Sequence, residues 1–153
     1  MSNVKPIPDG SGAPTPYLTV NNGAAAIDFY KSVFGAEELM RMAEENGRIG
    51  HAELRIGGGI IMISDEYPEM GVLSPQTVGG SPVAIHLYVE DVDALFARAL
   101  AAGAKVLRPL EDQFYGDRAG KLADPFGHLW FCATHKEDVS PEEIGRRAQA
   151  MFS

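Results

Sequence analysis

Polar and apolar side chains alternate between residues 51 and 56, which read His-Ala-Glu-Leu-Arg-Ile. Alternation along a strand sends the two sets to opposite faces of a sheet, so the polar set faces either solvent or a cavity. A carboxylate beside an imidazole in a partly dry cleft is suited to proton transfer, and Glu53 could then act as a base with His51 as its partner. The alternative is a solvated sheet face with neighbouring charges.

Several other residues with reactive or polar side chains have simpler interpretations. His128 follows a glycine turn and His135 lies beyond the last predicted strand, so both are expected to be exposed. Tyr115, Asp117 and Arg118 are expected in a loop, where they could close over a ligand. The alternative is an ion pair between Asp117 and Arg118 that fixes a hairpin.

The elements that must position these residues occur twice along the chain. Residues 15–20 and 84–89 have strand patterns, and each is followed by a helix pattern, at residues 24–34 and after Asp91. Each half continues with strands that are joined by glycine turns. Two pairs of glycines recur at the same offset of 69 residues: Gly47 with Gly116, and Gly58 with Gly127.

This repeat predicts a division of the chain into two modules and three other segments. We expect a flexible N-terminal segment at 1–13, a first βαβββ module at 14–66, a linker at 67–82, a second βαβββ module at 83–135 and a C-terminal helical segment at 136–153. The last helix should begin after Ser140, and its Ile144, Ala148 and Met151 should lie on the body or on a partner subunit.

The composition of the chain excludes some partners. Its 153 residues are 45% hydrophobic and 22% charged, which is typical of a folded domain, and its net charge is −8. So acidic a surface repels phosphate backbones and anionic lipids, and we therefore expect no nucleic-acid or membrane partner.

Two features of the sequence favour a cytoplasmic location. The chain has no apolar run of the length of a signal peptide, and its one cysteine, Cys132, has no partner for a disulfide within the chain. Cys132 itself should be a buried, inert thiol beside Trp130 under a helix.

The motifs of both halves resemble those of one known superfamily. They are residues 26–30 and 34–36 in the first half, and residues 87–93, 114–118 and 124–128 in the second. Two tandem βαβββ units with these motifs resemble the vicinal oxygen chelate superfamily, which includes glyoxalase I, bleomycin-resistance proteins and extradiol dioxygenases. The second half is most similar to its PhnB-like branch, often labelled 3-demethylubiquinone methyltransferase-like. The resemblance implies an α+β fold, the glyoxalase/bleomycin-resistance fold, with two curled mixed sheets around a cavity and a C-terminal helix.

The resemblance also indicates where a metal ion would bind. Carried over to this sequence, the superfamily's four ligand positions are Thr15, Met62, Ala84 and Phe131. None of them offers the carboxylate or imidazole that a hard divalent ion requires. We therefore expect no metal at these positions and no other cofactor.

If these four positions face the cavity, strand alternation places other residues there too. Aromatic and soft apolar side chains would suit a planar or apolar ligand, whereas the alternative is ordinary core packing, above all for a lone histidine on a strand. The predicted ligand-binding residues are Tyr17, Thr19, Met62, Ser64, His86, Tyr88, Tyr115 and Phe131.

Three functions remain open at this point. The first is a protein that binds a small organic molecule without a metal. The second is a metal-free proton-transfer enzyme that uses Glu53, with His51 or His86 assisting. The third is a metal-dependent glyoxalase-type lyase or dioxygenase that uses the set His51, Glu53 and His86. Methyltransferase activity finds no support, because the chain lacks a Rossmann-type glycine loop. Open edge strands and the C-terminal helix favour a homodimer.

Overall fold

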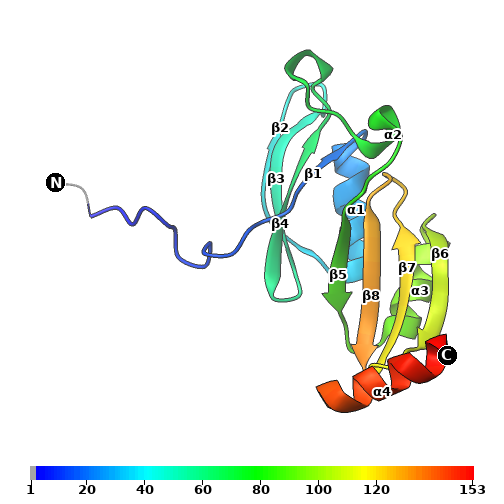
Figure 1. The fold of residues 1–153 in the computed structure, drawn as a ribbon. Helices are drawn as coiled ribbons and strands as arrows, with labels where there is room; N and C mark the ends of the chain where they lie inside the picture. Colours follow the sequence, from blue (N-terminus) through cyan, green and yellow to red (C-terminus); the bar gives the residue numbers. More distant parts are fainter. Residues whose placement is uncertain (1–2) are drawn as a thin grey trace.

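The computed structural model describes residues 3–153 and contains two four-stranded sheets (Figure 1). Both modules have the order strand, helix, strand, strand, strand. The elements of the first are β1 (Tyr17–Val20), α1 (Gly23–Phe34), β2 (Glu37–Ala43), β3 (Ile49–Ile56) and β4 (Gly59–Asp65). Those of the second are β5 (Ala84–Tyr88), α3 (Val92–Ala101), β6 (Lys105–Asp112), β7 (Asp117–Ala123) and β8 (Leu129–His135).

The repeat in the sequence is a repeat in topology. The strand order is β1-β4-β3-β2 in the first sheet and β5-β8-β7-β6 in the second. In each sheet the first pair of strands is parallel and the other pairs are antiparallel, so both sheets are mixed. The predicted α+β fold with tandem βαβββ units and a C-terminal helix is therefore confirmed.

The helix of each module, α1 and α3, begins at a capping residue, as its sequence predicts. The side chain of Asn22 accepts a hydrogen bond from the amide of Ala25, and the side chain of Asp91 accepts one from the amide of Ala94. These bonds satisfy amides that the first turn of a helix leaves free. Gly35 ends α1 with a φ of 68°, a conformation that favours glycine.

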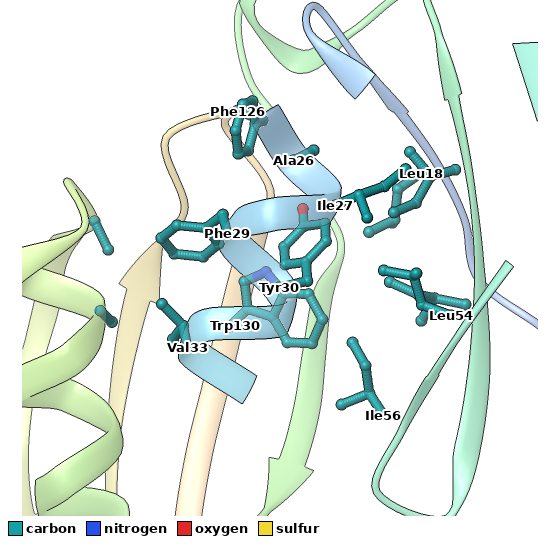
Figure 2. Close-up of a cluster of buried hydrophobic side chains, with 14 of the residues drawn as sticks. Leu18, Ala26, Ile27, Phe29, Tyr30, Val33, Leu54, Ile56, Phe126 and Trp130 are labelled. Atoms are coloured by element: carbon teal, nitrogen blue, oxygen red, sulfur yellow. The ribbon is translucent and has the colours of Figure 1, made fainter. Parts of the chain in front are cut away.

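Helix α1 lies between the two sheets, and this arrangement decides where the candidate residues can point. Figure 2 shows Leu18 and Leu54 of the first sheet to one side of α1 and Trp130 of the second sheet beside Tyr30 of the helix. The ring of Phe34 lies 4.3 Å from that of Trp130, measured between centroids. The buried side chains of both modules form one hydrophobic core, so the opposite, outer faces of the two sheets point away from this core.

A buried carboxylate joins the two modules inside this core. Asp124 accepts hydrogen bonds from the hydroxyl of Tyr30 at 2.5 Å and from the indole nitrogen of Trp130 at 3.0 Å. Its other oxygen accepts from two amides of its own turn, those of Phe126 and His128. Burial, followed by the charge and hydrogen bond of Asp124, raises the pKa of Tyr30 well above its ordinary value.

The short elements between and after the modules are less regular. Residues 67–82 contain a 3-10 helix, η1 (Pro68–Met70), and a short helix, α2 (Pro75–Val78). Helix α4 (Pro141–Phe152) crosses the ends of β7 and β8 (Figure 1). Arg147 fixes α4 to the body, because it donates to the carbonyl of Phe114 at 3.0 Å and pairs with Glu137. On the apolar stripe of α4, Met151 remains 59% exposed.

Three expectations about the second module are wrong. His135 is the last residue of β8 and does not lie beyond it, because β7 extends the sheet by pairing Asp117 with His135. Asp117 and Arg118 begin β7 and lie outside the loop in which they were expected, and Arg118 pairs with Asp93 and Asp112. His128 is half-buried, since its Nε2 bonds to the carbonyl of Thr19 at 2.8 Å.

Candidate functional site

The outer face of the first sheet carries most of the predicted residues of the first module. Cross-strand partners share a face, and the register defines a row across all four strands. This row consists of Met40, Glu53, Met62 and Tyr17. On the next row Met42 lies opposite His51, and Ser64 lies beside Thr19. Ala52 and Leu54 alternate with His51 and Glu53 along β3. Both are fully buried on the side of the sheet that faces the helix, as the alternation predicts.

A chain of hydrogen bonds runs along this face through Tyr17, His51 and Glu53. The Tyr17 hydroxyl lies 2.6 Å from Nδ1 of His51, and Nε2 of His51 lies 2.9 Å from Glu53 Oε2. A carboxylate accepts, so Nε2 of His51 donates to Glu53, and in the neutral tautomer that carries its proton on Nε2 the Nδ1 atom accepts from Tyr17. Burial, and then the charge of Glu53, raise the pKa of Tyr17, while a hydrogen bond with Ser64 acts in the opposite direction.

Of these three hydrogen-bonded residues, Tyr17 also lines a pocket. The pocket has a volume of about 500 Å³, and its apolar lining includes two aromatic rings and a thioether. Its lining residues are Tyr17, Thr19, Gly50, Ser64, Tyr67, Met70 and Val72. Glu53 and His51 do not line this pocket themselves, and they connect to it through the hydrogen bond between His51 and the Tyr17 hydroxyl.

Three of the lining residues come from the segment that was expected to be only a linker. An isolated bridge pairs Tyr67 with Val72, and the Tyr67 hydroxyl donates to Glu44 at 2.8 Å. The guanidinium of Arg48 lies 4.0 Å above the Tyr67 ring. The signal that could have identified this wall is the presence of a tyrosine, a methionine and a valine within a stretch of turn-forming residues.

The outer face of the second sheet carries a different network. The rings of His86 and Phe131 stack with centroids 5.6 Å apart, and the ring of Tyr88 lies 4.9 Å from that of His86. The Tyr88 hydroxyl donates to Asp117 at 2.6 Å. Tyr88 is 57% exposed and His86 is also exposed, so core packing does not explain either side chain.

A hydrogen bond joins the buried carboxylate of Asp117 to the exposed imidazole of His135. Nδ1 of His135 lies 2.7 Å from Asp117, and its Nε2 lies 2.7 Å from Asp138. Hydrogen bonds to Asp117 and Asp138 raise the pKa of His135. Burial opposes ionisation of Asp117, yet bonds from Tyr88 and His135 lower its pKa. Because His135 was assigned to exposed chain beyond the sheet, neither it nor Asp117 was predicted to take part in this network.

The pocket at Tyr17 and the cleft at Tyr88 draw on one module each, but two other cavities lie between the modules: Thr15 and His86 line one, and Tyr17 and Ala84 line the other. The pocket at Tyr17 has no lining residue from the second sheet, and the open cleft at Tyr88 and His135 has none from the first. His86 lines a third cavity, of about 320 Å³, together with Arg55 and Trp130. Tyr115 contributes to the second face only, where its charge raises the pKa of Tyr88 after the larger effects of Asp117 and burial.

The positions of the superfamily's metal ligands do not fit a hard ion. Met62 and Phe131 lie on different outer faces, and Thr15 and Ala84 add a hydroxyl and a methyl group. Within residues 3–153 no cluster of three His, Cys, Asp or Glu side chains could hold a metal. The other set considered, His51, Glu53 and His86, is not assembled, because the ring contacts of His86 are with Tyr88 and Phe131.

Two side chains expected beneath a helix lie there. Cys132 is fully buried and Trp130 is 1% exposed, both in the core. Burial raises the pKa of Cys132 to about 12, so its thiol stays protonated and unreactive. None of the helices in the described part of the chain is long and apolar enough to cross a bilayer.

Comparison with known proteins identifies the relatives of this architecture. Residues 14–131 match the model of the Glyoxalase/Bleomycin resistance protein/Dioxygenase superfamily. An uncharacterized protein of Mycobacterium tuberculosis, Rv0887c, is 48% identical over 133 residues, which cover 85% of this chain and 78% of that protein.

Solved structures share the fold. The crystal structure of TioX from Micromonospora sp. ML1 is 30% identical, with a TM-score of 0.63 over 84% of this chain and all of that one. A putative 3-demethylubiquinone-9 3-methyltransferase, the PhnB protein from Bacillus cereus, is 21% identical, with a TM-score of 0.62 over 79% of this chain and 98% of its own. The second likeness concerns the fold alone.

Proposed function

Because the chain belongs to the Glyoxalase/Bleomycin resistance protein/Dioxygenase superfamily, we propose that it binds a small planar or apolar organic molecule in the pocket at Tyr17. The observation that carries this proposal is the composition of the pocket wall. Tyr17, Tyr67 and Met70 offer two rings and a flexible thioether, which adapt to flat apolar ligands. A pocket of about 500 Å³ lies within the usual range for small-molecule sites.

A few polar groups would orient the ligand in this pocket. The Tyr17 hydroxyl, the Thr19 hydroxyl and the buried Ser64 hydroxyl lie on the same lining. Hydroxyl groups both donate and accept, so they suit a carbonyl or phenolic oxygen. We expect the ligand to present one such oxygen to Tyr17 and its flat surface to Tyr67 and Met70.

A thermal-shift screen of planar antibiotics and aromatic metabolites tests the binding function. Ligands that bind only the folded state raise the melting temperature. For a compound retained by the screen, Tyr17→Phe should weaken binding about fivefold to tenfold, because one buried hydrogen bond is lost. Phe152→Ala, at an 84% exposed position on α4, is the control and should bind like the wild type. A screen in which no compound stabilises the protein would speak against the proposal.

The proposed binding needs no divalent metal at the superfamily's ligand positions. The chemistry of Thr15, Met62, Ala84 and Phe131 supports this part of the proposal, because hard ions prefer carboxylates and imidazoles. Metal analysis of the purified protein tests it directly. Stoichiometric nickel, zinc, iron or manganese would overturn it and favour a metal-dependent lyase or dioxygenase.

A second candidate function, proton transfer without a metal, is favoured by the hydrogen-bond chain behind Tyr17. The Tyr17 oxygen would take a proton from the substrate while its own proton passes to Nδ1 of His51, and Glu53 would stabilise the resulting imidazolium. Glu53 would then be a positioning residue and not the base that meets the substrate. Glu53→Gln should lower turnover of an identified substrate at least a hundredfold, and unchanged turnover would exclude this function.

The chain is further proposed to work as a homodimer with a cavity completed across subunits. Tyr17 is 52% exposed on one outer face and Tyr88 is 57% exposed on the other, and a second copy could cover both. The superfamily's converging positions, here represented by Met62 and Phe131, could meet only between two chains. We also propose membership of the PhnB-like branch, from residues 87–93, 114–118 and 124–128, and a cytoplasmic location without nucleic-acid or membrane partners.

A further inference from the structure

We infer that His51 determines which class of ligand the pocket at Tyr17 accepts. While its imidazole is neutral, the pocket takes a ligand that donates a hydrogen bond to Tyr17, such as a phenol or a ring N–H. Once the imidazole is protonated, the pocket takes a ligand that accepts one, such as a ketone. His51 does not line the pocket and acts through the Tyr17 hydroxyl, as a positioning residue. The inference rests on the proposed binding function and narrows its ligand class.

The first argument is that the Tyr17 hydroxyl has only one proton to donate. Its oxygen lies 2.6 Å from Nδ1 of His51, and Nε2 of the same ring lies 2.9 Å from Glu53. When the neutral ring carries its proton on Nε2, the Nδ1 atom is an acceptor and takes the tyrosine proton. The phenolic oxygen can then only accept from a ligand, so the ligand must bring an O–H or N–H group.

The second argument is that protonation of the ring reverses this bond. An imidazolium donates from both nitrogens, so Nδ1 of His51 would donate to the Tyr17 oxygen while Nε2 still donates to Glu53. The proton of the tyrosine hydroxyl is then available to a carbonyl oxygen of the ligand. Burial, which is the largest effect, raises the pKa of Tyr17 above its ordinary 10.0, so the hydroxyl keeps its proton throughout this change.

The third argument is that the groups around Tyr17 and His51 leave the direction of this bond to the imidazole. The buried Ser64 hydroxyl also bonds to Tyr17, but a hydroxyl can donate or accept and fits either direction. Opposite His51 on β2 lies the uncharged Met42. The remaining charged or titratable groups of this face and its loops pair with one another: Arg55 with Glu37, and Glu44 with Arg48 and Tyr67.

An NMR titration of the ¹⁵N-labelled full chain with indole and 1-indanone tests the inference. Both probes are flat, uncharged and similar in size, but indole only donates a hydrogen bond and 1-indanone only accepts one. The ratio of their dissociation constants is measured at about pH 8, where an ordinary imidazole is neutral, and at about pH 5.5, where it is protonated. The ratio should change about tenfold in favour of 1-indanone at the lower pH, because a mismatched donor or acceptor loses its hydrogen bond.

Two variants and a control assign this change to the pair of residues. Tyr17→Phe should remove the change with pH because the hydroxyl is lost, and His51→Gln should remove it because an amide does not titrate. His128→Gln is the matched control. The ring of His128 bonds to the carbonyl of Thr19 and does not line this pocket, so the change with pH should persist.

The outcomes separate this inference from the binding function on which it rests. Ring ¹⁵N shifts of His51 in the ligand-free protein at about pH 8 should show a protonated Nε2 and an unprotonated Nδ1. The opposite tautomer would overturn the inference, whatever binds. A ratio that is equal at both pH values, or a change that persists in His51→Gln, would overturn it and leave the binding function intact. If neither probe shifts the amides of the pocket residues at either pH, the binding function fails and the inference fails with it.

Discussion

Asp124 illustrates how one residue can connect distant parts of a chain. Its carboxylate accepts two bonds from amides of its own turn and two from the buried side chains of Tyr30 and Trp130. Asp124→Ala would leave both side-chain donors buried without a partner. We expect it to lower the free energy of unfolding by about 3 kcal/mol or more, measured by urea denaturation.

Tyr30→Phe is the matched variant, because it removes one of these bonds and leaves the carboxylate with its other donors. It should cost about 1 to 2 kcal/mol. A loss below about 1 kcal/mol for Asp124→Ala would show that the bonds contribute little, and the junction would then depend on packing alone.

His135 gives stability a defined pH dependence. Its pKa is raised above the ordinary 6.5 in the folded protein by Asp117 and Asp138, so its bonds stabilise the fold below about pH 6.5, and this stabilisation is lost as the pH rises through the raised value. The lowered pKa of Asp117 keeps its carboxylate ionised over that range. His135→Gln should therefore destabilise the protein more at about pH 5.5 than at about pH 9.

Tyr88→Phe is the control for this dependence. It removes another bond to Asp117, but the pKa of Tyr88 is raised above its ordinary 10.0, so Tyr88 does not titrate in this range. Its loss of stability should be the same at both pH values. Equal losses for His135→Gln at both values would contradict the assigned role of His135.

At the residue scale, the sequence predicted the direction of side chains better than their partners. Alternation correctly separated His51 and Glu53 from the buried Ala52 and Leu54, because a strand leaves only two directions. It could not predict the bond between Tyr30 and Asp124, which are 94 positions apart and meet only when the modules pack.

At the element scale, the internal repeat provides a matched pair of glycines. Gly47 and Gly116 both have positive φ values, of 87° and 103°. A Cβ at Gly47 would meet nothing, whereas one at Gly116 would overlap the carbonyl oxygen of Glu137. Gly47→Ala should cost about 1 to 2 kcal/mol for the backbone alone, and Gly116→Ala at least about 2 kcal/mol more, measured by urea denaturation. Equal losses in the free energy of unfolding would show that the segment from Lys136 to Asp138 moves away from the new Cβ without destabilising the protein.

Elements with periodic or capping signals were predictable, and the pocket wall was not. Alternation and capping identified six of the eight strands and the helices of the two modules to within a few residues, because those signals are local. Residues 67–72 carry turn-forming residues that are compatible with many paths. Their position over the first sheet depends on the bond from Tyr67 to Glu44, which joins segments distant in sequence.

At the scale of the whole molecule, the sequence did not reveal how the two sheets pack against each other. Two βαβββ modules can pack through their helices or place their open faces together, and the repeat is the same in both cases. One signal was present in α1, where apolar side chains between Ala26 and Phe34 cover more than one side of the helix and leave the polar Asp28, Lys31 and Ser32 exposed. A helix that is apolar on several sides is buried between layers, and α1 packs against both sheets.

This arrangement makes a complementation experiment decisive for the proposed dimer. Tyr17→Arg should block the first face and Phe131→Arg the second, so each variant alone should lose binding of a compound retained by the thermal-shift screen. If a cavity joins the first module of one chain to the second module of its partner, a heterodimer of the two variants has one cavity with both changes and one with neither.

The heterodimer is obtained by co-expressing the two variants with different tags and purifying on both tags. It should bind about half the ligand that the wild-type dimer binds. A heterodimer that binds none would place each cavity within one chain, and a wild-type protein with the 16.5 kDa mass of a single chain in solution would exclude the dimer itself.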